Sequence, residues 1–288
     1  MKSTYRAVVA LLSFMAISVG SADAAGPVAF LSNMKGDVAV DGDTRPVLLV
    51  ELASGQKIVV GKDANAAVMY ITSGKEFVLK GPGEYVVKDA EVAATSGAQP
   101  TARTTEWRAS NKVLGQVAQT ASASVRMRSI AQPKADTGPK LLFPTQGAVA
   151  TLTPTFRWRA DESSKPQVEF VLRAAGQDKP VQQAKVAGDS YKAHWRFFKS
   201  AKLKPDTEYT WTVTTNGEEV GTATFRTLSA DDIRLLDKRR PSDKADFSDR
   251  LYFTLMLQDM GAVQEAQESW AKLAEERTDL PELAAFGK

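Results

Sequence analysis

The chain has 288 residues, 43% hydrophobic residues and a formal net charge of +3, which fits a globular protein of about two domains. It contains no cysteine and a single histidine, so disulfides, thiolate nucleophiles and multi-histidine metal sites are excluded. The nearly balanced charge argues against a nucleic-acid partner.

The first 24 residues are typical of a secretory signal peptide. Lys2 and Arg6 precede an apolar run, residues 7–20, and residues 22–24 (Ala-Asp-Ala) place small side chains where a signal peptidase requires them. The run is shorter than the roughly 20 residues that span a bilayer, so we expect cleavage rather than a membrane anchor. The mature chain is then expected in the periplasm, without stable insertion into the membrane.

Residues 26–90 consist of short apolar runs separated by glycine turns, without a helical period. This spacing predicts an all-β sandwich or roll. The segments that carry the pattern are residues 36–40 (GDVAV), 55–58 (GQKI), 63–69 (DANAAVM) and 73–79 (SGKEFVL). They resemble the FecR domain. The resemblance implies a periplasmic, non-catalytic module, which in regulators belongs to a protein that relays iron-chelate uptake to a sigma factor.

Residues 91–139 are expected to connect two domains. Residues 91–105 are rich in alanine, threonine, serine and glycine, which is the composition of a linker. From Ser110 to Val125, apolar residues recur at helical spacing and predict an amphipathic helix. This helix either packs on a β domain, which we favour, or docks on a membrane surface or a partner.

Residues 140–228 predict a second β domain with a core of bulky side chains. Trp158, Tyr209 and Trp211 lie in segments of alternating pattern, each on the apolar face of its strand. The dipeptide Asn216-Gly217 is a strong signal for a β-hairpin.

The spacing of Leu203, Pro205, Thr207 and Tyr209 resembles the tyrosine-corner segment of fibronectin type III modules. Two further parts of the resemblance are residues 154–158 and 225–227. The resemblance implies an immunoglobulin-like sandwich that binds or spaces other molecules. It does not fix a ligand.

A cluster of aromatic residues in this domain is a candidate ligand surface. An exposed cluster would stack against a sugar or a peptide. The competing interpretation, which we favour, is a strand whose rings enter the core. The cluster comprises Tyr191, Trp195, Phe197 and Phe198.

The residues offer little support for an enzyme. His194 lies beside the aromatic cluster, but no glycine-flanked serine elbow accompanies it anywhere in the chain. A glycoside hydrolase needs only two carboxylates close in space, so that class stays open as the least favoured function.

Residues 229–288 are expected to be helical. Ser229 caps a first helix, and two apolar-periodic runs follow, residues 245–260 and 263–277. The last two runs resemble one tetratricopeptide repeat. The matching residues are Leu257, Gly261, Ala266 and Trp270.

A single repeat of this kind cannot bury its own apolar face, so the hairpin must pack on a β domain or on a partner. We favour packing on its own chain. The candidate docking residues are Leu251, Leu255, Trp270 and Leu273.

The predicted fold is mainly β, with two β domains, an intervening helix and a C-terminal helical hairpin. The predicted function is an exported, non-catalytic binding or scaffolding protein whose partner is another envelope protein. The alternative is a carbohydrate- or peptidoglycan-binding protein of the cell envelope that uses the aromatic cluster. An envelope hydrolase is less favoured, and no cofactor or metal is expected.

Overall fold

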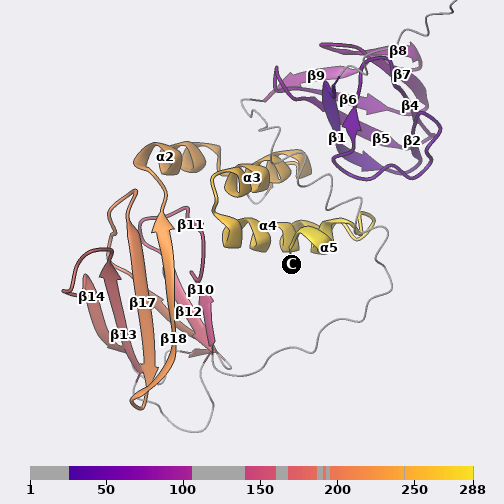
Figure 1. Cartoon of the computed structure of the whole chain (residues 1–288). Coiled ribbons are helices and arrows are strands. Elements are labelled where there is room, and N and C mark those ends of the chain that lie inside the picture. Colours follow the sequence, from indigo (N-terminus) through magenta and orange to yellow (C-terminus); the bar gives the residue numbers. More distant parts are fainter. Residues whose placement is uncertain are drawn as a thin grey trace, which may run out of the picture.

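A computed structural model describes residues 26–105, 140–159, 168–186, 191–192, 195–242 and 244–287. The protein is mainly β, and its C-terminal helices lie between two groups of strands (Figure 1). We call residues 26–105 the first β unit, residues 140–228 the second β unit and the helices of residues 230–286 the helical bridge.

The first β unit consists of two antiparallel sheets that share one core. Its strands are β1 Ala29–Lys35, β2 Val38–Val40, β3 Glu51–Leu52, β4 Lys57–Val60, β5 Asn65–Tyr70, β6 Lys75–Lys80, β7 Gly83–Val87, β8 Val92–Ser96 and β9 Thr101–Thr104. The strand orders are β3-β1-β5-β6-β9 and β2-β4-β7-β8. Strand alternation turns one side of each sheet inward: in β4, Ile58 and Val60 are buried whereas Lys57 and Val59 are exposed.

The structure extends the first β unit beyond the expected boundary at residue 90. Residues 91–105, expected to be a linker, instead contain β8 and β9, which pair with β7 and β6. Both are edge strands, and all but one of their side chains are half-buried or exposed. A strand in that position needs few apolar residues, so its composition resembles that of a linker.

The second β unit is a sandwich of two sheets around an aromatic core. Its strands are β10 Lys140–Phe143, β11 Ala148–Val149, β12 Thr155–Arg159, β13 Val168–Ala174, β14 Gln182–Val186, β15 Tyr191–Lys192, β16 Trp195–Lys199, β17 Glu208–Thr215 and β18 Glu218–Thr227. The sheet orders are β10-β12-β16-β15 and β11-β18-β17-β13-β14. Trp158, Tyr209 and Trp211 are buried between the sheets, as the alternation predicts.

Two local predictions in this unit are confirmed. Asn216 and Gly217 take positive φ angles of 53° and 86° in the turn that joins the antiparallel strands β17 and β18. The hydroxyl of Tyr209 accepts a hydrogen bond from the backbone N–H of Lys204 at 2.9 Å, which is the contact that defines a tyrosine corner.

The helical bridge contains α2 Ala230–Arg239, α3 Phe247–Asp259, α4 Val263–Glu276 and α5 Leu283–Phe286. Ser229 caps α2 as predicted, because its hydroxyl accepts the N–H of Asp232 at 3.1 Å. The expected hairpin is formed by α3 and α4. The helix expected over residues 110–125 lies outside the residues that the structure describes.

Candidate functional site

Helices α3 and α4 contribute to two separate apolar clusters. Leu251, Leu255, Trp270 and Leu273 pack against the first β unit, where the cluster includes Phe30, Leu48, Leu49 and Met69. The second cluster joins the bridge to Ala150 and Leu228 at the edge of the second β unit through Phe253, Leu257, Ala262 and Ala266. The bridge is therefore buried on two sides, and Figure 1 shows it between the two β units.

Polar contacts accompany the packing against the first β unit. Glu282, which is 5% exposed, accepts the backbone N–H of Leu48 at 2.8 Å. Arg277 donates to the side chain of Asn33 at 2.7 Å, and its guanidinium lies 4.8 Å from the ring centre of Phe247. These bonds give the apolar contact a defined position, because each depends on one geometry.

A buried carboxylate connects four elements at this interface. Glu76 of β6 is 1% exposed, and its Oε1 accepts the hydroxyls of Tyr252 on α3 at 2.6 Å and Ser32 on β1 at 2.9 Å. Its Oε2 accepts the guanidinium of Arg103 on β9. Arg103 also pairs with Asp249 on α3 at 3.1 Å. Both oxygens of Glu76 are thus engaged in holding α3 on the sheet.

The protonation of Tyr252 fits this role. Burial raises the pKa of Tyr252 well above its usual value, and the charge of Glu76 raises it further. The phenol therefore keeps its proton at neutral pH and donates to the carboxylate. Two hollows of about 440 and 540 Å³ flank the network, and Arg103 lines both of them.

Tyr252→Phe is expected to lower the free energy of unfolding by about 1–3 kcal/mol, because Glu76 stays buried with one donor fewer. Urea denaturation of the single variants and of the double variant with Glu76→Gln measures the coupling between the two side chains. The double variant should lose less than the two single variants together. A coupling near zero would show that this hydrogen bond does not stabilise the interface.

The start of α4 meets the second β unit through backbone groups. Gln264 accepts the N–H of Thr145 at 2.6 Å and donates to the carbonyl of Leu142 at 3.0 Å. The carbonyl of Gly261 approaches Gly147 so closely that a Cβ there would lie 2.8 Å from it. Gly147 also has a positive φ of 67°, so glycine is required at this position.

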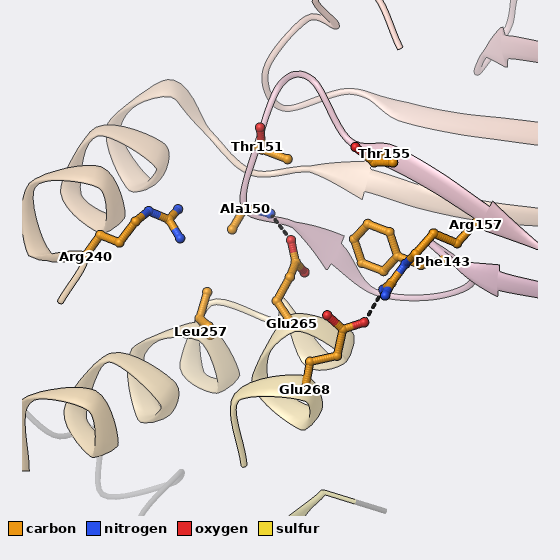
Figure 2. A pocket seen from close by; sticks show the side chains of 9 residues that line it. All are labelled: Phe143, Ala150, Thr151, Thr155, Arg157, Arg240, Leu257, Glu265 and Glu268. Atoms are coloured by element: carbon orange, nitrogen blue, oxygen red, sulfur yellow. Dashed lines mark hydrogen bonds and ion pairs between the residues drawn. The ribbon is translucent and has the colours of Figure 1, made fainter. Parts of the chain in front are cut away.

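An open hollow of about 430 Å³ lies beside these contacts (Figure 2). Arg157 of β12 forms an ion pair with Glu268 of α4, and its guanidinium lies 4.7 Å from the ring centre of Phe143. Arg240, which follows α2, lies across the hollow. The full lining is Phe143, Ala150, Thr151, Thr155, Arg157, Arg240, Leu257, Glu265 and Glu268.

The carboxyl group of Glu265 has few hydrogen-bond partners in this hollow. Its Oε1 accepts the backbone N–H of Ala150 at 2.8 Å, as Figure 2 shows. Its Oε2 is buried and has no hydrogen-bond partner among the described residues. Burial raises the pKa of Glu265 to about 7, against the opposing effect of the Ala150 N–H. This carboxyl group therefore exchanges its proton near neutrality.

The residues singled out from the sequence lie in different places. The four candidate docking residues are buried in the contact with the first β unit, so the chain itself covers them. Phe198 packs with its ring centre 4.5 Å from that of Phe170, at the margin of the second core. His194 and the side chains of Tyr191, Trp195 and Phe197 lie outside the described part of the structure.

Sequence reasoning did not identify Glu76, Tyr252 or Glu265. Glu76 and Tyr252 are 176 residues apart, so no local spacing relates them. Glu265 lies in the first turn of α4, where an acidic residue is ordinary because it complements the helix dipole. Its burial comes from the docking of another unit and leaves no local pattern.

The described residues contain no group of three or more histidine, cysteine, aspartate or glutamate side chains arranged to hold a metal ion. None of their helices combines the length and apolar character needed to cross a bilayer.

Comparisons with known proteins identify no family. No protein-family model matches the sequence. No curated protein matches it either. Among solved structures, the sensor domain of the anti-sigma factor RsgI4 from Pseudobacteroides cellulosolvens aligns with a TM-score of 0.24 and 17% identity. The alignment covers 34% of this chain and 99% of that domain. A likeness with this score supports no conclusion about the present chain.

Proposed function

We propose that the chain is an exported, non-catalytic scaffold of the cell envelope. The helical bridge would hold the two β units in a fixed arrangement, so that a protein bound to one unit is kept near a molecule bound to the other. The observation that carries this proposal is the burial of α3 and α4 against both β units.

The contacts of the bridge support a fixed spacing. Two units joined only by an exposed linker would move independently, whereas an apolar interface with defined hydrogen bonds restricts such motion. The first interface combines an apolar cluster with the contacts of Glu76, Arg277 and Glu282. The second combines another cluster with the contacts of Gln264 and Glu265. These polar groups serve the docking of the units, which is the use expected in a scaffold.

The export and the binding character rest on the sequence. The first 24 residues are typical of a cleaved leader, which supports an envelope location. The resemblances of the two β units to FecR and fibronectin type III modules support binding rather than turnover. Another envelope protein is the partner that we propose.

The fixed spacing can be tested directly because the chain contains no cysteine. Lys57→Cys on the first β unit and Glu218→Cys on the second introduce a unique pair for spin labels at exposed positions. We expect one narrow distance distribution in pulsed electron paramagnetic resonance. The pair Lys179→Cys and Glu218→Cys lies within the second unit and serves as the control for the width of the distance distribution. A much broader distribution between the units would refute a fixed arrangement.

Whether both β units bind other molecules requires a separate test. Photo-crosslinking residues placed on exposed positions of each unit, in intact cells, should yield adducts from both units. Adducts from one unit alone would show that the protein binds but does not bring two molecules together. The two experiments therefore separate the rigidity of the chain from its role as a scaffold.

One observation favours glycan binding as the second candidate. In β16, Phe198 pairs with the core residue Phe156, whereas positions 195 and 197 pair with Arg159 and Arg157, which are not core residues. Exposed aromatic rings suit stacking on sugars. Binding to purified peptidoglycan that disappears in Trp195→Ala, while the thermal unfolding temperature stays unchanged, would favour this function over scaffolding.

A further inference from the structure

One carboxyl group stands out at the contact between the helical bridge and the second β unit. Glu265 extends from α4 to the N–H of Ala150, and its other oxygen is buried without a partner among the described residues. A neutral carboxyl group tolerates such a position. A carboxylate there is costly, because it has left water and gained only one hydrogen bond from another residue, the N–H of Ala150.

The charged groups around Glu265 only partly compensate for its charge. Arg157 on β12 favours the ionised form, but Arg157 is already paired with Glu268, which disfavours it. Arg240 lines the far side of the hollow and pairs with Asp237 at 3.4 Å. The remaining polar groups of the lining are the hydroxyls of Thr151 and Thr155. Both arginines therefore have other acidic partners.

We propose that Glu265 makes the docking of the second β unit on the helical bridge sensitive to pH, with the tightest docking in mildly acidic conditions. The ionised form weakens the contact because the carboxylate regains water only when the two surfaces separate. Glu265 lies at the contact between the helical bridge and the second β unit, and this contact sets how the two β units are arranged. The inference depends on this contact and not on the location of the protein in the cell.

The direction of the pH dependence follows from the pKa of Glu265 in the docked state and in the separated state. This pKa is about 7 in the docked chain and returns towards the ordinary value of 4.5 when Glu265 meets water. Between these values the docked state binds a proton that the separated state lacks, so acid favours docking. The contribution is fully present below about pH 4.5 and is lost as the pH rises through 7. The equilibrium constant for separation should then increase roughly tenfold from pH 6 to pH 8.

Hydrogen exchange of the full chain, followed by NMR, measures this constant at single amides. After correction for intrinsic rates, the amide of Ala150 should show the roughly tenfold increase in opening from pH 6 to pH 8. The amide of Ala148, which donates to the carbonyl of Gly261 at 2.9 Å, reports on the same interface and should follow it. The amide of Leu48, bonded to Glu282 at the first interface, is the internal reference.

Glu265→Gln tests the assignment to this side chain. Glutamine keeps the size and a carbonyl oxygen for the Ala150 N–H but does not ionise, so the difference between pH 6 and pH 8 should vanish at Ala150 and Ala148. Glu275→Gln is the matched control, because it removes a carboxylate from an exposed position further along α4, away from the hollow. It should retain the pH step.

Three outcomes would overturn the proposal. One is an Ala150 amide in the wild type whose opening is the same at both pH values. Another is a difference in opening between pH 6 and pH 8 that persists in Glu265→Gln. The third is an equal step at Leu48, which would show that the whole fold responds. The wild-type measurement decides the first and third outcomes even if a variant fails to fold.

Discussion

Trp211→Ala is expected to lower the free energy of unfolding of the second β unit by about 3–5 kcal/mol, the usual loss for a large aromatic side chain in a core. Trp211 is 0% exposed, and its ring centre lies 4.9 Å from that of Phe156 and 5.9 Å from that of Phe170. Its indole N–H donates to the carbonyl of Pro144 at 2.6 Å, and truncation leaves that buried carbonyl unpaired.

Two further variants define the origin of this loss. Trp211→Phe keeps an aromatic ring but removes the N–H donor, so its loss should be smaller than that of the alanine variant. Thr212→Ala, the next residue along β17, changes a side chain on the outer face that bonds to Thr222 at 2.8 Å. It should cost less than about 1 kcal/mol, since exposed positions contribute little. A loss below about 1 kcal/mol for Trp211→Ala itself would contradict the burial that its contacts describe.

The second β unit shows what a sequence pattern can predict. The alternation of Tyr209, Trp211 and Val213 predicts a strand with one buried face, and the structure confirms it. Asn216-Gly217 predicts the hairpin because both residues tolerate positive φ angles. These features depend on neighbours within a few residues, so the chain carries them locally.

The first β unit shows where local pattern is insufficient. Strands β1 and β5 are buried on both faces, since Leu31 and Val68 face the core while Phe30 and Met69 face the helices. A continuous apolar run is typical of a doubly covered strand, but it does not say what covers the second face. The covering helices begin far along the chain, and no spacing within the strand refers to them.

The candidate site was the least predictable part for the same reason. Glu76 lies in a strand and Glu265 in the first turn of a helix, positions where acidic residues are usually exposed. Glu76 and the Oε2 atom of Glu265 become buried only when a distant element docks on them. The surplus of apolar residues on α3 and α4 did predict that the hairpin has a surface to cover. The choice between the first β unit, the second β unit and a partner depends on three-dimensional contacts.

Deletion of residues 242–288 is expected to destabilise the remaining chain by more than about 4 kcal/mol or to prevent its folding. The deletion removes α3, α4 and α5, and with them the cover of Phe30, Leu48, Leu49 and Met69 on the first β unit. Burial of one such side chain contributes about 1.5–3 kcal/mol, so exposing several of them exceeds that threshold. Thermal unfolding of the first β unit, followed by near-ultraviolet circular dichroism, measures the loss.

A single substitution in the full chain tests the same idea without truncation. Trp270 is 1% exposed and its ring centre lies 4.7 Å from that of Phe286, so Trp270→Ala should cost about 3–5 kcal/mol in urea denaturation. Leu235→Ala on the exposed side of α2 is the control, with an expected loss below about 1 kcal/mol. If the truncated chain keeps its stability but no longer binds its envelope partners, the hairpin is a docking element instead. If neither stability nor binding changes, both interpretations fail, because a buried pair of helices must contribute to one or the other.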